Sequence, residues 1–359
     1  MGNCCNKRKT EIYVSNKTPL KNNEEKIISI NDFEKIKIIG SGSFGNVYLV
    51  KNKNNNHYYA MKSLEKSLIK QKQQEEHTIS ERILMSKLKN PLMVKLYYCF
   101  QDKKYLYFIM EFVQGGELLY HLRKQIRFDD ERTRFYISEL ILALEFLHNN
   151  NIIYRDIKPE NILIDKTGHI KLIDFGLSKI YKDNNDKMFT ICGTPFYLAP
   201  EIIEKKGYNN SVDWWSLGSL MYEMLSGNPP FKIEGSNIYS INFNEPLKMD
   251  NCFSEEAKDL INKLLNIDPN KRLGYGKNGV EELKGHPYFK DINWEKLKNL
   301  EVTPPFIPEI KDSIDLKYIE LKVDDNNSNN DRSIENSVVD YYVNFSYYEK
   351  NSEIEQTHD

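Results

Sequence analysis

Cysteine is scarce in this chain of 359 residues, and its five cysteines follow no regular spacing. An odd number of cysteines without paired spacing predicts neither a disulfide framework nor a structural zinc site. Such usage is typical of a protein of the reducing cytoplasm. The five residues are Cys4, Cys5, Cys99, Cys192 and Cys252.

Long hydrophobic runs are also missing. No stretch of 18 apolar residues occurs, which argues against a membrane-spanning helix. Residues 1–32 are polar and rich in Asn and Lys, without the apolar core of a signal peptide. The formal net charge is only −2, so we expect no nucleic-acid partner.

Apolar periodicity divides the rest of the chain into a strand-rich and a helix-rich part. From Phe33, alternating apolar and polar residues predict five strands, with one helix over residues 68–88. Helical spacing dominates later, and Asp129 or Asp130 can cap the longest helix. From about residue 290 the chain becomes Pro-rich and then Asn/Asp-rich. We therefore predict a small sheet lobe, a larger helical lobe and a long tail.

A glycine-rich segment, GSGSFGNV, spans residues 40–47 between the first two predicted strands. Its glycines allow the backbone to approach phosphate groups closely, and its N–H groups can face an anion. A dinucleotide-binding fold would need a helix directly after this segment, but a strand follows. The segment alone is a weak indication, because glycine-rich hairpins are common.

A lysine lies near the middle of the third predicted strand, in YYAMK. Because an ammonium group in an apolar strand needs an anionic partner, Lys62 is expected to pair with a carboxylate of the next helix. Glu81 is the preferred partner, and Glu75 and Glu76 are alternatives.

Three further motifs follow in order: YRDIKPEN at 154–161, DFG at 174–176 and APE at 199–201. Any one of the five features can arise by chance, but their order, spacing and strand or helix context together cannot. Over residues 33–289 the chain resembles eukaryotic protein kinases.

The resemblance implies an α+β, bilobal protein kinase fold. The N-lobe (33–112) would be a small antiparallel sheet with one main helix, and the C-lobe (117–289) would be mostly helical. An N-terminal segment, 1–32, would precede them. A C-terminal tail, 290–359, would wrap around the N-lobe and carry a hydrophobic motif at 342–347.

The resemblance also implies ATP and Mg²⁺ as cofactors and assigns catalytic roles. Asp156 would accept the proton of the substrate hydroxyl, with Lys158 near the transferred phosphate. Lys62, oriented by Glu81, would hold the α- and β-phosphates.

Two motif residues, Asp174 and Asn161, would bind the metal ions. The remaining nucleotide contacts would come from the glycine-rich loop, the adenine pocket and the hinge. These residues are Gly40, Ser41, Gly42, Ser43, Phe44, Gly45, Val47, Ala60, Met110, Glu111, Val113 and Glu117.

Within the kinases, three features resemble the AGC group, which contains protein kinases A, B, C and G. They are YRD in place of HRD, the segment TICGTPFYLAPE, and the tail with PPFIP at 304–308. The tail then reaches YVNFSY (342–347), which matches the group's F-x-x-F-[ST]-[FY] motif except for its first Phe. We expect this motif to dock into the small lobe. Ile319 stands where the group usually has a Phe near ATP.

Phosphorylation is expected at two sites. Thr190 matches the group's activation-loop phosphosite, and Arg155, Lys179 and His77 are candidate partners for its phosphate. Ser346 in the hydrophobic motif is the second site. The resemblance implies an upstream activating kinase, similar to the phosphoinositide-dependent kinases.

Carboxylates at three positions match those by which basophilic AGC kinases hold arginines upstream of the target Ser or Thr. They are Glu117, Glu160 and Glu223, and carboxylate–guanidinium pairs are strong and directional. A structural helix acid is the alternative interpretation of Glu223. Leu198 would form an apolar floor for the residue after the target.

The N-terminal sequence MGNCCNKRK suggests a lipid anchor. Gly2 is a candidate for myristoylation, although Asn6 stands where Ser or Thr is usual, and Cys4 and Cys5 are candidates for palmitoylation. Stable anchoring takes a second signal beside one myristoyl chain, and the thioester lipids and basic residues 7–9 supply it. We therefore expect a cytoplasmic protein held at the inner face of the plasma membrane or at another membrane. An inert tail is the alternative.

Together these features predict a monomeric, MgATP-dependent serine/threonine kinase, similar in layout to protein kinase B or the serum- and glucocorticoid-regulated kinases. Its substrates would be proteins with basic residues upstream of the target. One alternative is a catalytically weak scaffold that binds nucleotide. Another is a cyclic-AMP-dependent catalytic subunit, against which the extension of the motif past Phe345 argues.

Overall fold

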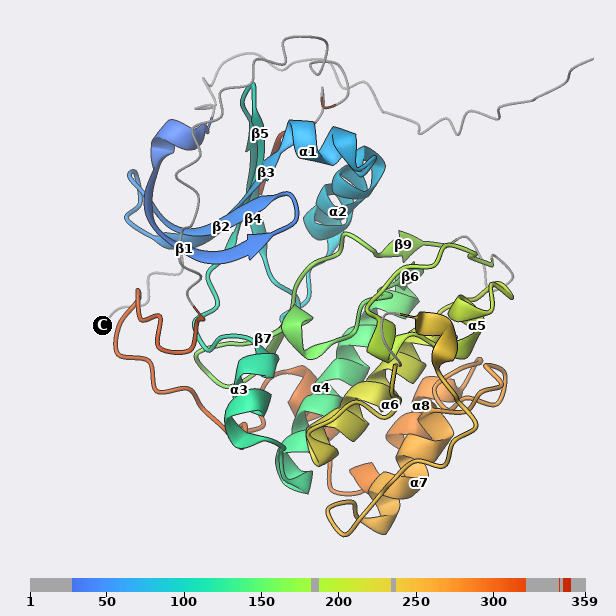
Figure 1. Ribbon diagram of the computed structural model, residues 1–359. Coiled ribbons are helices and arrows are strands. Elements are labelled where there is room, and N and C mark those ends of the chain that lie inside the picture. The colour runs from blue at the N-terminus through green and yellow to red at the C-terminus, as the bar shows by residue number, and fades with distance from the viewer. Residues whose placement is uncertain (1–27, 182–186, 234–236, 321–341, 343–344, 350–359) are drawn as a thin grey trace, which may run out of the picture.

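The computed structural model describes residues 28–181, 187–233, 237–320, 342 and 345–349. A sheet-containing lobe lies above a helical lobe, and the two are joined through the segment after β5 (Figure 1). This arrangement confirms the predicted α+β, two-lobed fold. The lipidation candidates Gly2, Cys4 and Cys5 lie outside the described residues.

The small lobe is built on a six-stranded antiparallel sheet in the order β1-β2-β3-β5-β4-β10. A short 3-10 turn, η1 (Ile30–Asp32), leads into it. The hairpin after β2 turns where Asn52 accepts a hydrogen bond from the Asn54 N–H and Asn56 adopts a positive φ of 60°. The strands are β1 (Phe33–Gly42), β2 (Gly45–Asn52), β3 (Tyr58–Glu65), β4 (Leu96–Gln101), β5 (Tyr105–Glu111) and β10 (Tyr347–Tyr348).

The helix predicted over residues 68–88 is two helices, α1 (Lys66–Gln71) and α2 (Glu75–Lys87). The prediction was wrong at the junction, where Gln73 adopts a left-handed φ of 54°. This turn allows both Ile69 of α1 and Leu84 of α2 to be buried. No glycine or proline marks the break in the sequence.

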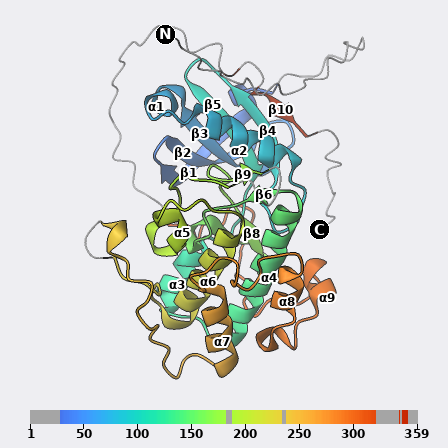
Figure 2. The same cartoon turned by 90° about the vertical axis from the view of Figure 1, so that its right-hand side faces the viewer.

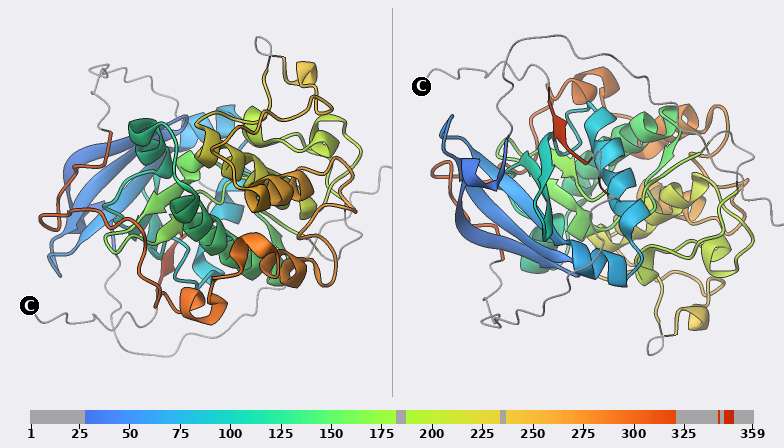
Figure 3. Two further views of the ribbon diagram at one scale, coloured as in Figure 1. Left: turned by 90° about the horizontal axis from the view of Figure 1, so that it is seen from below. Right: turned by 90° about the horizontal axis from the view of Figure 1, so that it is seen from above.

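The sixth strand, β10, comes from the far end of the chain and pairs with β4 (Figure 2). Just before it, Tyr342 and Phe345 are 2% and 1% exposed. The Phe345 ring lies edge-on to Phe108 of β5, with centroids 5.4 Å apart. The hydrophobic motif thus docks into the small lobe, and Tyr342 fills the place of the usual Phe. Seen from above, β10 lies at the edge of the sheet that adjoins α2 (Figure 3).

The large lobe is organised around α4 (Asp130–Asn149) and α6 (Ser211–Ser226). Asp129 caps α4 by accepting the Arg132 N–H at 2.7 Å, which decides between the two predicted capping residues. α6 is apolar on nearly all sides and is correspondingly buried. The other helices are α3 (Leu118–Gln125), α5 (Pro200–Ile203), α7 (Glu255–Leu264), α8 (Gly279–Lys284) and α9 (Trp294–Lys298).

Two short pairs of strands flank the loops that contain the motifs at 154–161 and 174–176. β6 (Ile152–Ile153) pairs with β9 (Lys179–Ile180), and β7 (Ile162–Ile164) pairs with β8 (Ile170–Leu172). The 3-10 turns of this lobe are η2 (Pro159–Asn161), η3 (Pro195–Tyr197), η4 (Ile238–Ser240) and η5 (Pro287–Phe289). None of the helices in the described part of the chain has the length and apolar character needed to cross a membrane.

The first half of the tail, up to residue 320, runs along the large lobe toward the hinge (Figure 1). The Arg132 guanidinium contacts the rings of Phe128 and Phe306, at 4.2 and 4.3 Å from their centroids. The cation–π contact between the buried Arg132 and the half-buried Phe306 stabilises the tail against the lobe. Further along, the Gln114 side chain donates to the carbonyl of Asp312 at 2.7 Å.

Candidate functional site

The loop at 154–161 is held by one buried carboxylate. Asp213 of α6 is 0% exposed and accepts the backbone N–H groups of Tyr154 and Arg155 at 3.0 and 2.8 Å. Its Oδ2 also lies within hydrogen-bond distance of His148 Nε2, at 2.8 Å. Arg155 has a φ of 69°, a costly conformation for a residue with a side chain, and these hydrogen bonds stabilise it.

Three side chains surround Asp156. Lys158 lies 2.8 Å from its Oδ2, the Asn161 amide donates to the same oxygen at 2.7 Å, and the Thr194 hydroxyl donates to Oδ1 at 3.1 Å. Lys158 also donates to the Thr194 hydroxyl at 2.9 Å. The structure therefore brings together the predicted Asp156, Lys158 and Asn161. Thr194 was missed, although it lies in the quoted segment TICGTPFYLAPE.

Lys62 of β3 pairs with Glu81 of α2, with Nζ and Oε1 2.7 Å apart, rather than with Glu75 or Glu76. Asp174 Oδ1 lies 4.0 Å from the same ammonium. Burial disfavours the charge on Lys62, but the two carboxylates outweigh it and raise the pKa of Lys62. The lysine is therefore a permanent cation, as a phosphate ligand needs to be.

Asp174 is suited to bind a metal ion. Its backbone has a strained φ of 58°, and its side chain is 50% exposed, so the carboxylate is accessible. The Lys62 ammonium, with the Gly176 N–H as a hydrogen-bond donor, lowers the pKa of Asp174. The Asn161 amide makes its hydrogen bonds to Asp156 through its nitrogen, which leaves its oxygen to serve as a ligand. Two oxygen ligands suit Mg²⁺, which takes few protein ligands beside phosphates and water.

The glycine-rich loop is the hairpin between β1 and β2, where Gly42 pairs with Gly45. Gly45 is required by packing, because a Cβ there would lie 1.9 Å from the carbonyl oxygen of Ser63. The Phe44 carbonyl accepts the Glu65 N–H at 2.8 Å, which ties the tip of the hairpin to the end of β3. The predicted loop residues Gly40, Ser41, Gly42, Ser43, Phe44, Gly45 and Val47 all belong to this hairpin.

The hinge follows β5. The predicted Met110 pairs with Ala60 of β3, and the Glu111 N–H donates to the Lys95 carbonyl at 2.9 Å. Val113 is 6% exposed.

The tail passes over the end of the hinge at Gly116. Gly116 has a φ of 76°, and a Cβ there would lie 2.1 Å from the Tyr318 carbonyl oxygen. Ile319, the residue after this contact, closes a turn by donating its N–H to Leu316.

Two of the three predicted substrate carboxylates lie close enough to interact. Glu223 is largely buried and accepts a hydrogen bond from the Tyr197 hydroxyl. Burial raises the pKa of Glu223, and the charge of Glu160 adds to the rise. Glu160 Oε2 is buried and has no hydrogen-bond partner among the described residues. Such a pair of carboxylates favours a cationic ligand.

The other two predicted substrate residues lie at less decisive positions. Glu117 precedes α3 and is exposed. Leu198 is only 5% exposed, and the accessible apolar side chain beside it is Phe196, which is 41% exposed. Sequence reasoning did not single out Phe196.

Thr190 is exposed and lines a cavity of about 240 Å³ with all three of its predicted basic partners, His77, Arg155 and Lys179. Lys187, which sequence reasoning missed, lines it too. The Thr190 carbonyl accepts the Tyr208 hydroxyl at 2.8 Å, and that hydroxyl also accepts from Arg155 at 3.0 Å.

Comparison with known proteins agrees with this geometry. A family model described as the protein kinase domain matches residues 33–289. The cAMP-dependent protein kinase catalytic subunit of Dictyostelium discoideum is 47% identical over 293 residues, which are 81% of this chain and 45% of that protein. The kinase gad8 of Schizosaccharomyces pombe is 46% identical over 296 residues, 82% of this chain and 52% of its own length. The kinase sgk-1 of Caenorhabditis elegans is 43% identical over 316 residues, 86% of this chain and 68% of its own length.

The chain spans about half the length of the first two relatives. The family model covers most of the chain, and the relatives are kinases of the AGC type, which the sequence motifs had indicated. The chain therefore belongs to the protein kinase domain family, and within it to the AGC type.

Proposed function

We propose that the protein transfers the γ-phosphoryl group of MgATP to Ser or Thr hydroxyls of other proteins. The observation that carries this proposal is that Lys62 of the small lobe, paired with Glu81, lies 4.0 Å from Asp174 of the large lobe, while Asp156 is paired with Lys158. Phosphoryl transfer depends on positioning and charge neutralisation rather than on covalent chemistry by the protein. Mg²⁺, when bound, neutralises phosphate charge.

Each side chain of the site would have a separate role in phosphoryl transfer. Lys62, held by Glu81, would bind the α- and β-phosphates, and Asp174 and Asn161 would ligate the metal. Asp156 would orient the substrate hydroxyl and accept its proton, while Lys158 would lie beside the transferred group. A carboxylate with hydrogen bonds from three side chains is fixed in orientation before the substrate arrives.

We further propose that the preferred substrates carry arginine upstream of the target residue. The support is the pair Glu160 and Glu223, of which one carboxylate oxygen is buried without a partner. A guanidinium placed there would supply the missing donors, and charged hydrogen bonds are strong.

The first prediction concerns activity on a serine peptide with arginines three and five positions before the serine. The enzyme, phosphorylated on Thr190, should phosphorylate this peptide, and Asp174→Ala should lower kcat/KM by about a hundredfold or more. Radiolabel transfer from MgATP measures both. A matched peptide with alanines in place of the arginines tests the preference.

Equal rates on the two peptides would remove the specificity proposal and leave the kinase. Absence of transfer by enzyme with verified Thr190 phosphate would favour a nucleotide-binding scaffold instead.

The second prediction is a pH dependence of peptide binding. Because the pKa of Glu223 is raised, the carboxylate becomes neutral at a higher pH than an ordinary glutamate and then attracts arginine less. The KM for the arginine peptide should therefore rise as the pH falls through this raised pKa. Glu223→Gln should raise that KM about tenfold, the value of one charged hydrogen bond, and flatten the profile. Identical pH profiles of KM for the two enzymes would contradict the assignment.

We propose that phosphorylation of Thr190 activates the enzyme, through an upstream kinase. A phosphate there adds nearly two negative charges facing four basic side chains, and Arg155 adjoins the catalytic Asp156. Ser346 is exposed beside β10 and is proposed as the second phosphosite.

The third prediction follows from this arrangement. Thr190→Ala should lower kcat by about tenfold or more, since each charged hydrogen bond is worth roughly that factor. Thr167→Ala, at an exposed loop between β7 and β8, is the control and should leave the rate unchanged. Full activity of Thr190→Ala would refute the proposal.

We also propose membrane attachment through acyl groups on Gly2, Cys4 and Cys5, supported by the sequence MGNCCNKRK alone. The fourth prediction is that Gly2→Ala moves the protein from the membrane to the soluble fraction and abolishes labelling by a myristate analogue. Peptide phosphorylation by the variant should be unaffected, because the change lies outside the kinase domain. Unchanged fractionation would contradict the proposal.

A further inference from the structure

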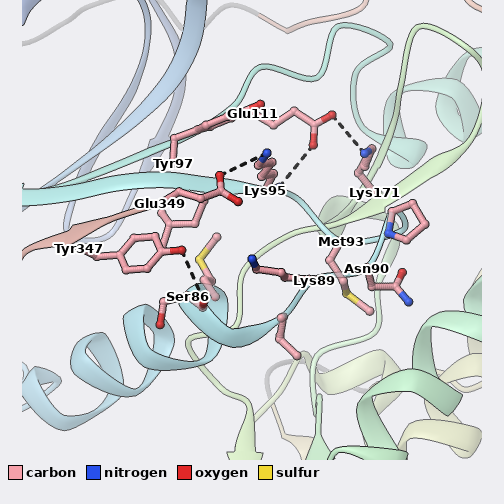
Figure 4. Close-up of a pocket in the computed structure, with 14 residues that line it drawn as sticks. Ser86, Lys89, Asn90, Met93, Lys95, Tyr97, Glu111, Lys171, Tyr347 and Glu349 are labelled. Atoms are coloured by element: carbon pink, nitrogen blue, oxygen red, sulfur yellow. Dashed lines mark hydrogen bonds and ion pairs between the residues drawn. The ribbon is translucent and has the colours of Figure 1, made fainter. Parts of the chain in front are cut away.

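Four charged residues from four segments around the hinge form a continuous set of contacts (Figure 4). They are Glu349 of the tail, Lys95 just before β4, Glu111 at the end of β5, and Lys171 of β8. They line a cavity of about 440 Å³ together with Tyr97 and Tyr347. None of the three contacts between them was predicted from the sequence.

The first contact joins the tail to the small lobe beyond the hydrophobic motif. The Glu349 N–H donates to the Tyr97 carbonyl at 3.1 Å, and its carboxylate lies 3.2 Å from Lys95 Nζ. The Lys95 ammonium also lies 4.8 Å from the centroid of the Tyr97 ring. The Glu349 side chain is only 13% exposed, so this end of the tail is packed rather than loosely placed.

The second contact joins Lys95 to the hinge. The Lys95 carbonyl accepts the Glu111 N–H at 2.9 Å, and the Lys95 N–H donates to Glu111 Oε2 at 3.3 Å. The backbone of Glu111 is thus held by the residue whose side chain the tail binds. Glu111 is a proposed nucleotide contact, so its position bears on the affinity for ATP.

The third contact reaches the large lobe. Lys171 Nζ lies 3.1 Å from Glu111 Oε1, and Lys171 is followed after two residues by Asp174. The backbone supports the same connection, since Val94 and Leu172 join the two lobes by a hydrogen bond of 2.9 Å.

We infer that Glu349 is a positioning residue for nucleotide binding, acting through Lys95 on the hinge backbone of Glu111. The inference rests on the proposed kinase function and adds a role for the tail that is separate from the burial of Phe345. The Glu349 carboxylate holds the Lys95 ammonium in place. Lys95 in turn fixes the backbone of Glu111, which would contact the nucleotide. Lys171 holds the opposite oxygen of the Glu111 carboxylate and completes the connection to the strand before Asp174.

The test is a charge-reversal cycle in the full-length chain with Glu349→Lys, Lys95→Glu and the double variant. Each single variant places like charges about 3 Å apart and should raise the KM for ATP about threefold, the range for a partly exposed pair. kcat and the KM for the peptide should not change, which separates positioning from general damage. The double variant restores opposite charges and should recover most of the affinity.

The control is Glu255→Lys on α7, which removes an ion pair with Lys258 of 2.7 Å far from the hinge and should change none of these constants. In 1 M salt, where the Debye length is about 3 Å, the differences between the variants should shrink.

Nucleotide affinity is also measured without catalysis, by titration with a fluorescent N-methylanthraniloyl ATP. If the wild type binds this nucleotide but transfers no phosphate, the proposed function fails and the cycle still tests the role of Glu349. Equal affinities for wild type and Glu349→Lys would overturn the inference. So would a double variant no better than the single variants, because the contact with Lys95 would then not be the cause.

Discussion

The ion pair between Lys62 and Glu81 is the interaction on which the arrangement of the small lobe depends, because it joins the sheet to α2. An ammonium and a carboxylate taken from water repay their desolvation only with close geometry, and here Nζ and Oε1 are 2.7 Å apart. The ring of Phe108 lies beneath the same ammonium, with its centroid 5.7 Å away. Phe345 of the tail packs edge-on against Phe108. The tail is thereby part of the packing that fixes this pair.

The large lobe follows the same rule that buried charges are paired. Asp213 is fully buried and is satisfied by hydrogen bonds with His148 and with two backbone N–H groups. Arg272 is 1% exposed and pairs with Glu201 at 2.6 Å, which fixes the segment after the activation loop. In each case a carboxylate holds a loop that carries proposed catalytic or substrate residues. Breaking such a pair would leave an uncompensated charge, which costs about 3–5 kcal/mol.

The residues predicted from the sequence are those that lie in contiguous motifs with fixed spacing. Lys62 could be paired with the following helix because that helix offers only a few carboxylates, Glu75, Glu76 and Glu81. The structure shows that Glu81 is the partner. The break at Gln73 was missed because no glycine or proline marks it in the sequence. The break forms because it allows one face of each helix to be buried. Thr194, β10 and the contact between Lys95 and Glu349 depend on residues far apart in sequence. Local pattern carries no information about such pairs.

Each contact of the tail forms more readily because all of them are made by one chain. Tyr318 lies over Gly116, Phe345 lies behind Phe108, and Glu349 binds Lys95, so the tail meets elements of the nucleotide site at separate points. Once Phe345 is docked, Glu349 binds at the high effective concentration set by the four residue steps between them. A partly exposed ion pair such as Lys95–Glu349 is weak alone. Because Glu349 lies only four residues after the docked Phe345, forming this ion pair costs little further chain entropy. The pair can therefore hold the edge of the hinge in place.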